Sequence, residues 1–330
     1  MQVILALTLA SLGAAPFAGI NEDLVWTADA DLPQAVEALR ASGAQAIRLP
    51  FRWRVIEPEQ EKWEFDKLDR VIAALPKDME VLATLMSPPT WATGIEPGKC
   101  EGWFDAYPPK DLGPWRAYVT KVVSRYKDRV KHWEIWNEEN GVDFYRPLPD
   151  AAGYTALLRT AYEAAKQSDP KCVVVLGGLQ MNGVIANPWS PVKTPDFLEA
   201  LYAAGAGKWF DACNIHPYAL PSEGAAHMMD LIRDTFAVME RHGDGSKPLW
   251  ITEVGCGLNG GTTAEAQAKL LSDTYGLARA EPRIKRVYWF LLRDMEGDLL
   301  GPEASMGIVK RDFTGKPALE AFRGAAAPRP

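Results

Sequence analysis

Two stretches of this sequence place a glutamate where an apolar segment ends. HWEIWNEEN, residues 132–140, runs from two tryptophans and an isoleucine into an amide and two adjacent carboxylates, and LWITEV, residues 249–254, carries Glu253 near its end. Two opposed carboxylates can cleave a glycosidic bond, because a protonated one donates to the leaving oxygen and an ionised one attacks the anomeric carbon or activates water. We therefore take Glu138 and Glu253 as the candidate catalytic pair.

The two carboxyls must differ in pKa to play these roles. Arg48 beside Glu253 would favour the ionised form of that carboxyl, and an apolar wall near Glu138 would raise its pKa. Arg48 suits a purely structural ion pair equally well, so both roles stay open. Glu139 competes with Glu138 for the role of the acid. Successive strand residues point to opposite sides, however, so we do not expect both glutamates to face one pocket.

Elements of two kinds alternate along the chain and must position these residues. Short runs rich in β-branched and aromatic residues are followed by longer stretches of helical period. Helix starts are predicted after Asp31, Asp66 and Asp150, and at the capping box Thr262-x-x-Glu265. The eight candidate strands are FAGI (17–20), AQAIRLPF (44–51), EVLATLM (80–86), VKHWEIWN (130–137), CVVVLGG (172–178), FDACNIH (210–216), LWITEV (249–254) and RVYWFLL (286–292).

This alternation predicts an α/β fold, a single-domain (β/α)8 TIM barrel over residues 17–330. A doubly wound sheet is the alternative, but no GxGxxG motif follows the first strand. In a barrel, chemistry sits at the C-terminal ends of the strands. The polar and aromatic residues predicted there, besides the two glutamates, are Arg48, Asn137, His216, Tyr218 and Trp289.

Two further tryptophans lie in the long loop predicted after the third strand, residues 90–115. We expect Trp91 and Trp103 in or beside the cleft, where an indole ring can stack on a sugar, although part of this loop must simply cover the barrel. His216 taken alone would more often be a satisfied core histidine. Its place in HPY, residues 216–218 at a strand end, favours a role in the site.

The composition argues against several classes of partner. A net charge of -7, from 36 basic and 43 acidic residues without a long basic run, argues against nucleic acid. Membrane insertion is not expected, because no run of eighteen apolar residues occurs. We expect a monomer with a carbohydrate substrate and no cofactor.

The four cysteines and the N-terminus bear on metals and on export. Cys100, Cys172, Cys213 and Cys256 form no CxxC pair and have no histidine at zinc spacing, so we expect no metal. Residues 1–16 have the apolar core and small residues of a signal peptide but lack a basic start, so they are either that or an N-terminal extension. A signal peptide would make the chain secreted or periplasmic. A disulfide between two of these cysteines would then be possible, but the sequence does not predict which two would pair.

The motifs together resemble the retaining glycoside hydrolases of clan A. WNE after the fourth strand, ITE on the seventh, the arginine on the second and HPY after the sixth carry the resemblance, and RLPFRWRVIEPEQEKWEFDKLDRV (48–71) is similar to family 39 and related β-glycosidases. The resemblance implies that Glu138 is the acid/base and Glu253 the nucleophile. It also implies that Asn137 binds the sugar 2-hydroxyl, that Tyr218 hydrogen-bonds the nucleophile and that Trp289 floors the first subsite.

The sequence departs from the family pattern at one position, and two other functions remain as alternatives. Many members of the family read Asn-Glu-Pro, whereas Glu139 follows Glu138 here, so the geometry of this loop stays open. A barrel that only binds glycan would not need both glutamates, and a Schiff-base aldolase would need a lysine at a strand end, where none is predicted. The sugar, the linkage and the choice of exo or endo action are not predicted.

Overall fold

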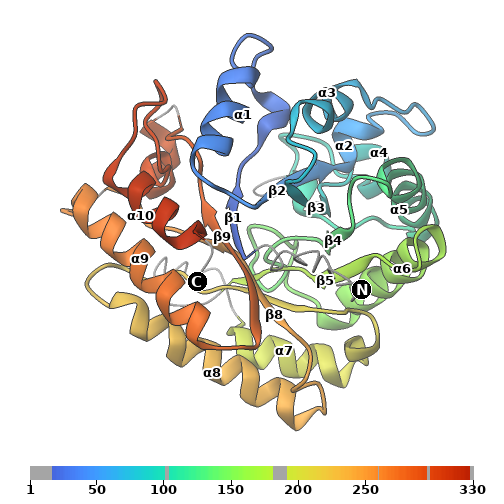
Figure 1. The fold of residues 1–330 in the computed structure, drawn as a ribbon. Helices are drawn as coiled ribbons and strands as arrows, with labels where there is room; N and C mark the ends of the chain where they lie inside the picture. The colour runs from blue at the N-terminus through green and yellow to red at the C-terminus, as the bar shows by residue number, and fades with distance from the viewer. Residues whose placement is uncertain (1–16, 101–103, 181–191, 259, 296–297, 328–330) are drawn as a thin grey trace, which may run out of the picture.

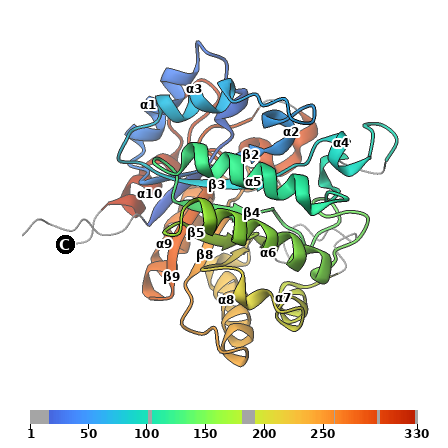
Figure 2. The same ribbon diagram turned by 90° about the vertical axis from the view of Figure 1, so that its right-hand side faces the viewer.

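The chain forms one curled sheet of parallel strands surrounded by helices (Figures 1 and 2). This computed structural model describes residues 17–100, 104–180, 192–258, 260–295 and 298–327, so the predictions on residues 1–16 and on Trp103 lie outside the described residues. Within those residues nine strands lie in the order β5-β4-β3-β2-β1-β9-β8-β7-β6. The strands are β1 (Ala18–Asn21), β2 (Ala46–Arg52), β3 (Glu80–Met86), β4 (His132–Ile135), β5 (Val173–Leu176), β6 (Leu179–Gln180), β7 (Cys213–His216), β8 (Leu249–Val254) and β9 (Ile284–Phe290).

The sheet closes on itself between β5 and β7. Val175 forms a parallel bridge with Ala212, and the Leu176 amide donates to the Ala212 carbonyl at 3.0 Å. β6 continues along β7, with Gln180 opposite His216. The predicted fifth strand, 172–178, is therefore observed as β5, which ends at Leu176, and a second short strand, β6, follows after Gly177 and Gly178 and was not predicted. The prediction of a (β/α)8 barrel is confirmed, with nine strand segments in place of the eight expected.

Helices cover the outside of this barrel, as Figure 1 shows. The α-helices of the described residues are α1 (Leu32–Ala41), α2 (Trp53–Ile56), α3 (Asp66–Ala74), α4 (Thr90–Thr93), α5 (Leu112–Tyr126), α6 (Ala151–Ser168), α7 (Thr194–Ala203), α8 (Gly224–Arg241), α9 (Ala264–Ala280) and α10 (Pro317–Ala326). Short 3-10 helices lie between them: η1 (Leu24–Trp26), η2 (Phe104–Ala106), η3 (Ala206–Lys208) and η4 (Asp298–Ser305). In this part of the chain no helix is both long and apolar enough to span a bilayer.

Three helix starts show how closely capping signals locate helices in this chain. The Asp150 side chain accepts from the Ala152 amide at 3.0 Å and begins α6 as predicted. The α9 cap is Thr263, whose hydroxyl accepts from the Ala266 amide at 3.1 Å, so the predicted cap at Thr262 is wrong by one residue. α3 begins at Asp66 itself.

Side chains of the strands alternate between two apolar layers. One layer fills the space between the strands and the helices and includes Ile47 and Trp133. The other lies inside the barrel and consists of Ala46, Leu82, Val175, Ala212, Trp250 and Tyr288. Because successive residues of a strand face opposite sides, Ala46 faces inward where Ile47 faces outward. The inner layer is a packed floor, above which polar side chains fill the barrel.

Candidate active site

A buried ion pair joins β2 to β4 inside the barrel. Arg48 donates from Nε to Glu134 Oε2 at 2.6 Å and from Nη2 to Glu134 Oε1 at 3.1 Å. Glu134 also accepts from Thr84, Asn214 and Thr252 at 2.8–3.0 Å. Burial opposes its charge, but Arg48 and these donors outweigh burial and hold the pKa of Glu134 below its ordinary value. Glu134 is thus an ionised, fully satisfied anchor for the Arg48 guanidinium.

Glu253, on β8, is held by donors from three other parts of the chain. Asn21 Nδ2 donates to its Oε2 at 2.9 Å, and Arg48 Nη1 donates to the same oxygen at 3.1 Å. Tyr218 Oη donates to Oε1 at 2.6 Å. Hydrogen bonds of this kind stabilise a carboxylate and fix its orientation. Arg48 therefore serves both of the roles left open by the sequence, as a structural ion-pair partner and as a neighbour of Glu253.

Glu138 lies three residues beyond β4, where the chain turns out of the sheet. Trp136 and Glu138 both have left-handed backbones, with φ of 75° and 49°. Strained conformations of non-glycine residues cost about 1–3 kcal/mol each and persist only when their surroundings hold them. The Glu138 amide donates to the Gly178 carbonyl at 3.0 Å, and Asn140 exchanges two hydrogen bonds of 2.8 Å with the Gln180 backbone. The exit from β4 is thus fixed to β6 and the residues before it.

The environment of Glu138 makes its carboxyl a weak acid. Burial raises the pKa of Glu138 to about 8, against the opposing effect of Arg48, and the negative charges of Asp143 and Glu134 raise it further. The side chain is 7% exposed. At neutral pH this carboxyl therefore carries a proton.

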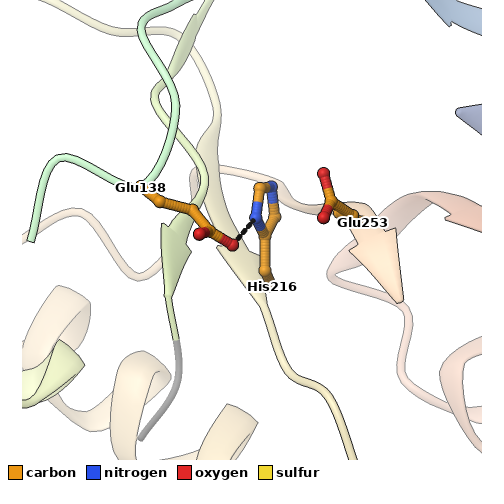
Figure 3. A group of neighbouring side chains, drawn as sticks. All are labelled: Glu138, His216 and Glu253. Atoms are coloured by element: carbon orange, nitrogen blue, oxygen red, sulfur yellow. Dashed lines mark hydrogen bonds and ion pairs between the residues drawn. The ribbon is translucent and has the colours of Figure 1, made fainter. Parts of the chain in front are cut away.

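The hydrogen bonds of His216 agree with that protonation state (Figure 3). The fully buried imidazole contacts Glu138 Oε1 through Nδ1 at 2.8 Å and Thr252 Oγ1 through Nε2 at 3.0 Å. Burial lowers the pKa of His216 to about 4, so the ring is neutral. The Thr252 hydroxyl donates its one hydrogen to ionised Glu134, so it accepts from Nε2–H. Nδ1 is then an acceptor, and the hydrogen in its bond to Glu138 belongs to the carboxyl.

Glu138, His216 and Glu253 lie close together at the mouth of the barrel. Each offers an oxygen or nitrogen within 4.8 Å of the other two, and Figure 3 shows Glu253 on the side of the imidazole away from Glu138. Carboxylate and imidazole atoms at this spacing could ligate a metal ion. Glu253, however, already accepts from the Arg48 cation and from Asn21, and Glu138 carries a proton. These features suit acid–base chemistry better, and the expectation of no metal stays a prediction.

The two neighbours of Glu138 in the chain have separate surroundings. Asn137 is 6% exposed, and its Oδ1 accepts from Arg48 Nη2 at 2.6 Å, so it shares this arginine with Glu253. Glu139 is fully buried against Gly177, and neither of its oxygens has a hydrogen-bond partner within the described residues. Burial raises the pKa of Glu139 well above its ordinary value. Glu138 rather than Glu139 therefore faces His216 and Glu253.

Trp289 does not lie on the cleft, so its predicted role as a sugar platform is wrong for this structure. Its side chain is fully buried, and the indole nitrogen donates to the Met306 carbonyl at 2.9 Å. The reason is strand parity: Tyr288 faces into the barrel, so Trp289 on β9 faces the helices.

Trp91 is half-buried and packs against α2 and the residue that follows it. Its indole nitrogen donates to the Glu57 carbonyl at 3.0 Å, and its ring meets Trp53 edge to face with centroids 5.4 Å apart. These contacts fix Trp91 against α2 and do not join it to the cluster around Glu138 and Glu253. Its predicted place beside the cleft stays a prediction.

Sequence reasoning missed four residues of the site. Asn21 ends β1 and follows the predicted strand directly, so its place as a polar residue at a strand end could have revealed it. Glu134 lies between Trp133 and Ile135, which face outward, so strand alternation could have placed it inside the barrel, whereas its contact with Thr252 joins strands distant in sequence. Asn140 fixes the β4 exit loop, and no signal in the sequence identifies its contact with Gln180.

The fold of this chain is a (β/α)8 barrel that resembles those of solved glycoside hydrolases. Residues 170–307 match the family described as Glycosyl hydrolase catalytic core. This stretch includes His216, Tyr218 and Glu253, whereas Glu138 precedes it.

Several known proteins are similar to this chain. A β-xylosidase of Geobacillus stearothermophilus is 36% identical over 70 residues, which are 19% of this chain and 14% of that enzyme. A family 39 glycoside hydrolase from Bacteroides cellulosilyticus superposes on 95% of this chain and 64% of its own, with 20% identity and a TM-score of 0.73. A monomeric β-xylosidase from Caulobacter crescentus matches 96% of this chain and 70% of its own, with 18% identity and a TM-score of 0.72. The chain thus spans less than two thirds of the Bacteroides enzyme.

Proposed function

We propose that this chain hydrolyses β-glycosidic bonds of an oligo- or polysaccharide with retention of configuration, by double displacement. The observation that carries the proposal is the unequal carboxyl pair at the barrel mouth. One carboxyl oxygen of Glu138 lies within 4.8 Å of one carboxyl oxygen of Glu253. The two carboxyl groups stand about 5–5.5 Å apart in retaining enzymes and roughly 6.5–9.5 Å apart in inverting ones, so this distance favours retention. Glu138 is protonated at neutral pH, and Glu253 is oriented by three donors.

In the proposed mechanism each side chain takes part in a step. The Glu138 proton passes to the leaving oxygen while Glu253 attacks the anomeric carbon and forms a glycosyl ester. Glu138, now ionised, then takes a proton from the water that cleaves the ester. Arg48, Asn21 and Tyr218 hold Glu253 in position throughout, and Asn137 lies where it can bind a hydroxyl beside the ester.

Two variants test the roles of the carboxyls. Glu253→Ala should abolish turnover of 4-nitrophenyl β-glycosides, and azide should rescue it to give the α-azide. Glu138→Ala should keep activity on substrates with good leaving groups and lose it on poor ones, because only poor leaving groups need protonation. Product configuration is measured by NMR of the first-formed sugar.

Glu139→Ala is the matched control for Glu138→Ala, because the two carboxyls are adjacent and only Glu138 faces Glu253. Leaving-group dependence in the Glu139 variant would move the acid by one residue, and an inverted first product would refute double displacement. A barrel that only binds glycan would show binding without turnover in the unmodified chain. Inactivation by borohydride in the presence of substrate would instead indicate Schiff-base chemistry.

A further inference from the structure

Four side chains form a continuous chain of hydrogen bonds from the mouth of the barrel into its interior. Glu138 Oε1 contacts His216 Nδ1 at 2.8 Å, and Nε2 of the same ring contacts Thr252 Oγ1 at 3.0 Å. The Thr252 hydroxyl donates to Glu134 Oε1 at 3.0 Å. His216, Thr252 and Glu134 are fully buried, so bulk water cannot replace any of these partners. Each hydrogen in the chain therefore has to serve the contact in which it lies.

Glu134 fixes the direction of this chain. It is ionised and paired with Arg48, so it only accepts hydrogen bonds. The Thr252 oxygen gives its one hydrogen to Glu134, and one of its two lone pairs accepts from Asn214 Nδ2 at 2.8 Å. The second lone pair faces His216 Nε2, which must then carry the ring hydrogen. Reversal of the chain is disfavoured, because a hydrogen bond to a carboxylate is roughly twice as strong as one to a neutral acceptor.

We propose that Thr252 is a positioning residue, which fixes the tautomer of His216 so that the Nδ1 lone pair faces the proton of Glu138. The inference rests on the proposed function, in which Glu138 is the acid, and adds a residue that keeps its proton in place. The opposite tautomer would point an N–H at the same carboxyl, and a donor there favours the ionised form. Thr252 thus acts on the acid through the imidazole.

Other charged and titratable groups also act on Glu138. Arg48 on β2 lowers the pKa of its carboxyl, whereas Glu134 on β4 and Asp143 in the loop after β4 raise it. The remaining groups that face it are Glu139 in the same loop, Tyr218 after β7, Glu253 on β8 and Glu303 on η4. A change of tautomer leaves all of these groups in place, so a variant of Thr252 tests the imidazole.

Thr252→Val replaces the hydroxyl by a methyl group. Nε2 then loses its acceptor, and the ring hydrogen should move to Nδ1, where it can donate to the Glu138 carboxylate. Nitrogen NMR shifts of the His216 ring at neutral pH should show Nε2–H in the unmodified chain and Nδ1–H in this variant. On a substrate with a poor leaving group, the midpoint of the alkaline limb of kcat/KM should fall by about one pH unit or more, because an N–H now stabilises the ionised acid.

Thr84→Val is the matched control, because Thr84 also donates to Glu134, at 2.9 Å, but from β3 and to the other carboxylate oxygen. It should keep the tautomer and the midpoint, and so should Thr252→Ser, which retains the hydroxyl. The tautomer of the unmodified chain tests the proposal even if Thr252→Val fails to fold.

Three results would overturn the role of Thr252. They are an Nδ1–H tautomer in the unmodified chain, an unchanged tautomer in Thr252→Val, and an equal fall of the midpoint in Thr84→Val. The NMR measurement needs no turnover. An unmodified chain that cleaves no glycoside but shows the expected tautomers in all variants would therefore refute the proposed function and still support the tautomer assignment.

Discussion

Two glutamates with the same side chain have different surroundings at the barrel mouth. Glu253 accepts three hydrogen bonds from side-chain donors, one of them a guanidinium. Glu138 is buried beside the neutral imidazole of His216, whose one N–H donates to Thr252 and so is not available to Glu138. Burial thus makes Glu138 a weak acid, and different surroundings are the usual way in which paired carboxyls acquire different roles.

This difference predicts the pH dependence of catalysis. The folded pKa of Glu138 is raised to about 8, so the proton needed for the first step is present below that pH and is lost as the pH rises through it. We expect kcat/KM on a substrate with a poor leaving group to fall on the alkaline side with a midpoint near the same pH. Glu138→Gln, assayed with a good leaving group, should lack this limb. An alkaline limb centred two or more pH units lower in the unmodified chain would contradict the assignment.

At the scale of elements, the short β6 strand ties the acid to the barrel. Its two residues pair with β7 on one side, and on the other side Asn140 occupies the place of a neighbouring strand. The adjoining glycines are needed there. A Cβ on Gly177 would lie 2.1 Å from a Glu139 oxygen, and one on Gly178 would lie 1.9 Å from the His216 ring. The break between β5 and β6 therefore makes room for both side chains.

Asn140→Ala should loosen this attachment. It removes the acceptor of the Gln180 N–H group and one of two donors to the Gln180 carbonyl, which also accepts from Thr194, so we expect a loss of about 1–3 kcal/mol in the free energy of unfolding, measured with urea. The turnover number should fall as well, because Glu138 would no longer be held in its left-handed conformation. Asn140→Asp keeps the acceptor for the Gln180 amide and should lie between the two. Unchanged stability and turnover in Asn140→Ala would show that the contact is dispensable.

Strand positions can be predicted from the sequence more closely than side-chain directions. Apolar, β-branched composition locates the strands, because burial on both faces of a parallel sheet demands it. Which residues face inward depends on the register of each strand. The prediction placed Trp289 on the cleft because it did not consider that alternate residues of β9 face the helices. Most of the residues that sequence patterns do identify lie at or after the end of a strand: Asn137, Glu138, His216, Tyr218 and Glu253. Arg48 lies within β2. The buried network around Glu134 depends on contacts between strands distant in sequence, which no local pattern reveals.

At the scale of the whole molecule, the barrel interior is filled in layers. The apolar floor of Trp250, Tyr288 and their neighbours lies below the polar layer of Arg48 and Glu134, and the catalytic pair lies at the mouth. The floor is tightly packed at Gly19, which lies opposite Tyr288 in the register of β1 and β9. A Cβ on Gly19 would lie 2.3 Å from the tyrosine ring.

Gly19→Ala should therefore destabilise the whole barrel. Forcing the Tyr288 ring aside should cost about 1–3 kcal/mol, seen as a lower Tm by circular dichroism. Gly276→Ala is the matched control, since Gly276 lies within α9 and a Cβ there would meet no atom within 4 Å. That change should stabilise the chain by roughly 0.5–1 kcal/mol through helix propensity. A Gly19 variant as stable as the parent would mean that the floor can rearrange.

The donors around Glu253 also make its two oxygens unequal before any sugar arrives. Oε2 accepts from Asn21 and from Arg48, whereas Oε1 accepts only from Tyr218 among the described residues. Negative charge is drawn toward Oε2, where the cation lies. If Glu253 is the nucleophile, Oε1 is the oxygen with a lone pair to spare for the new bond, and Oε2 becomes the ester carbonyl. The hydrogen bonds to Glu253 would then determine, before substrate binds, which of its two oxygens is presented to the anomeric carbon.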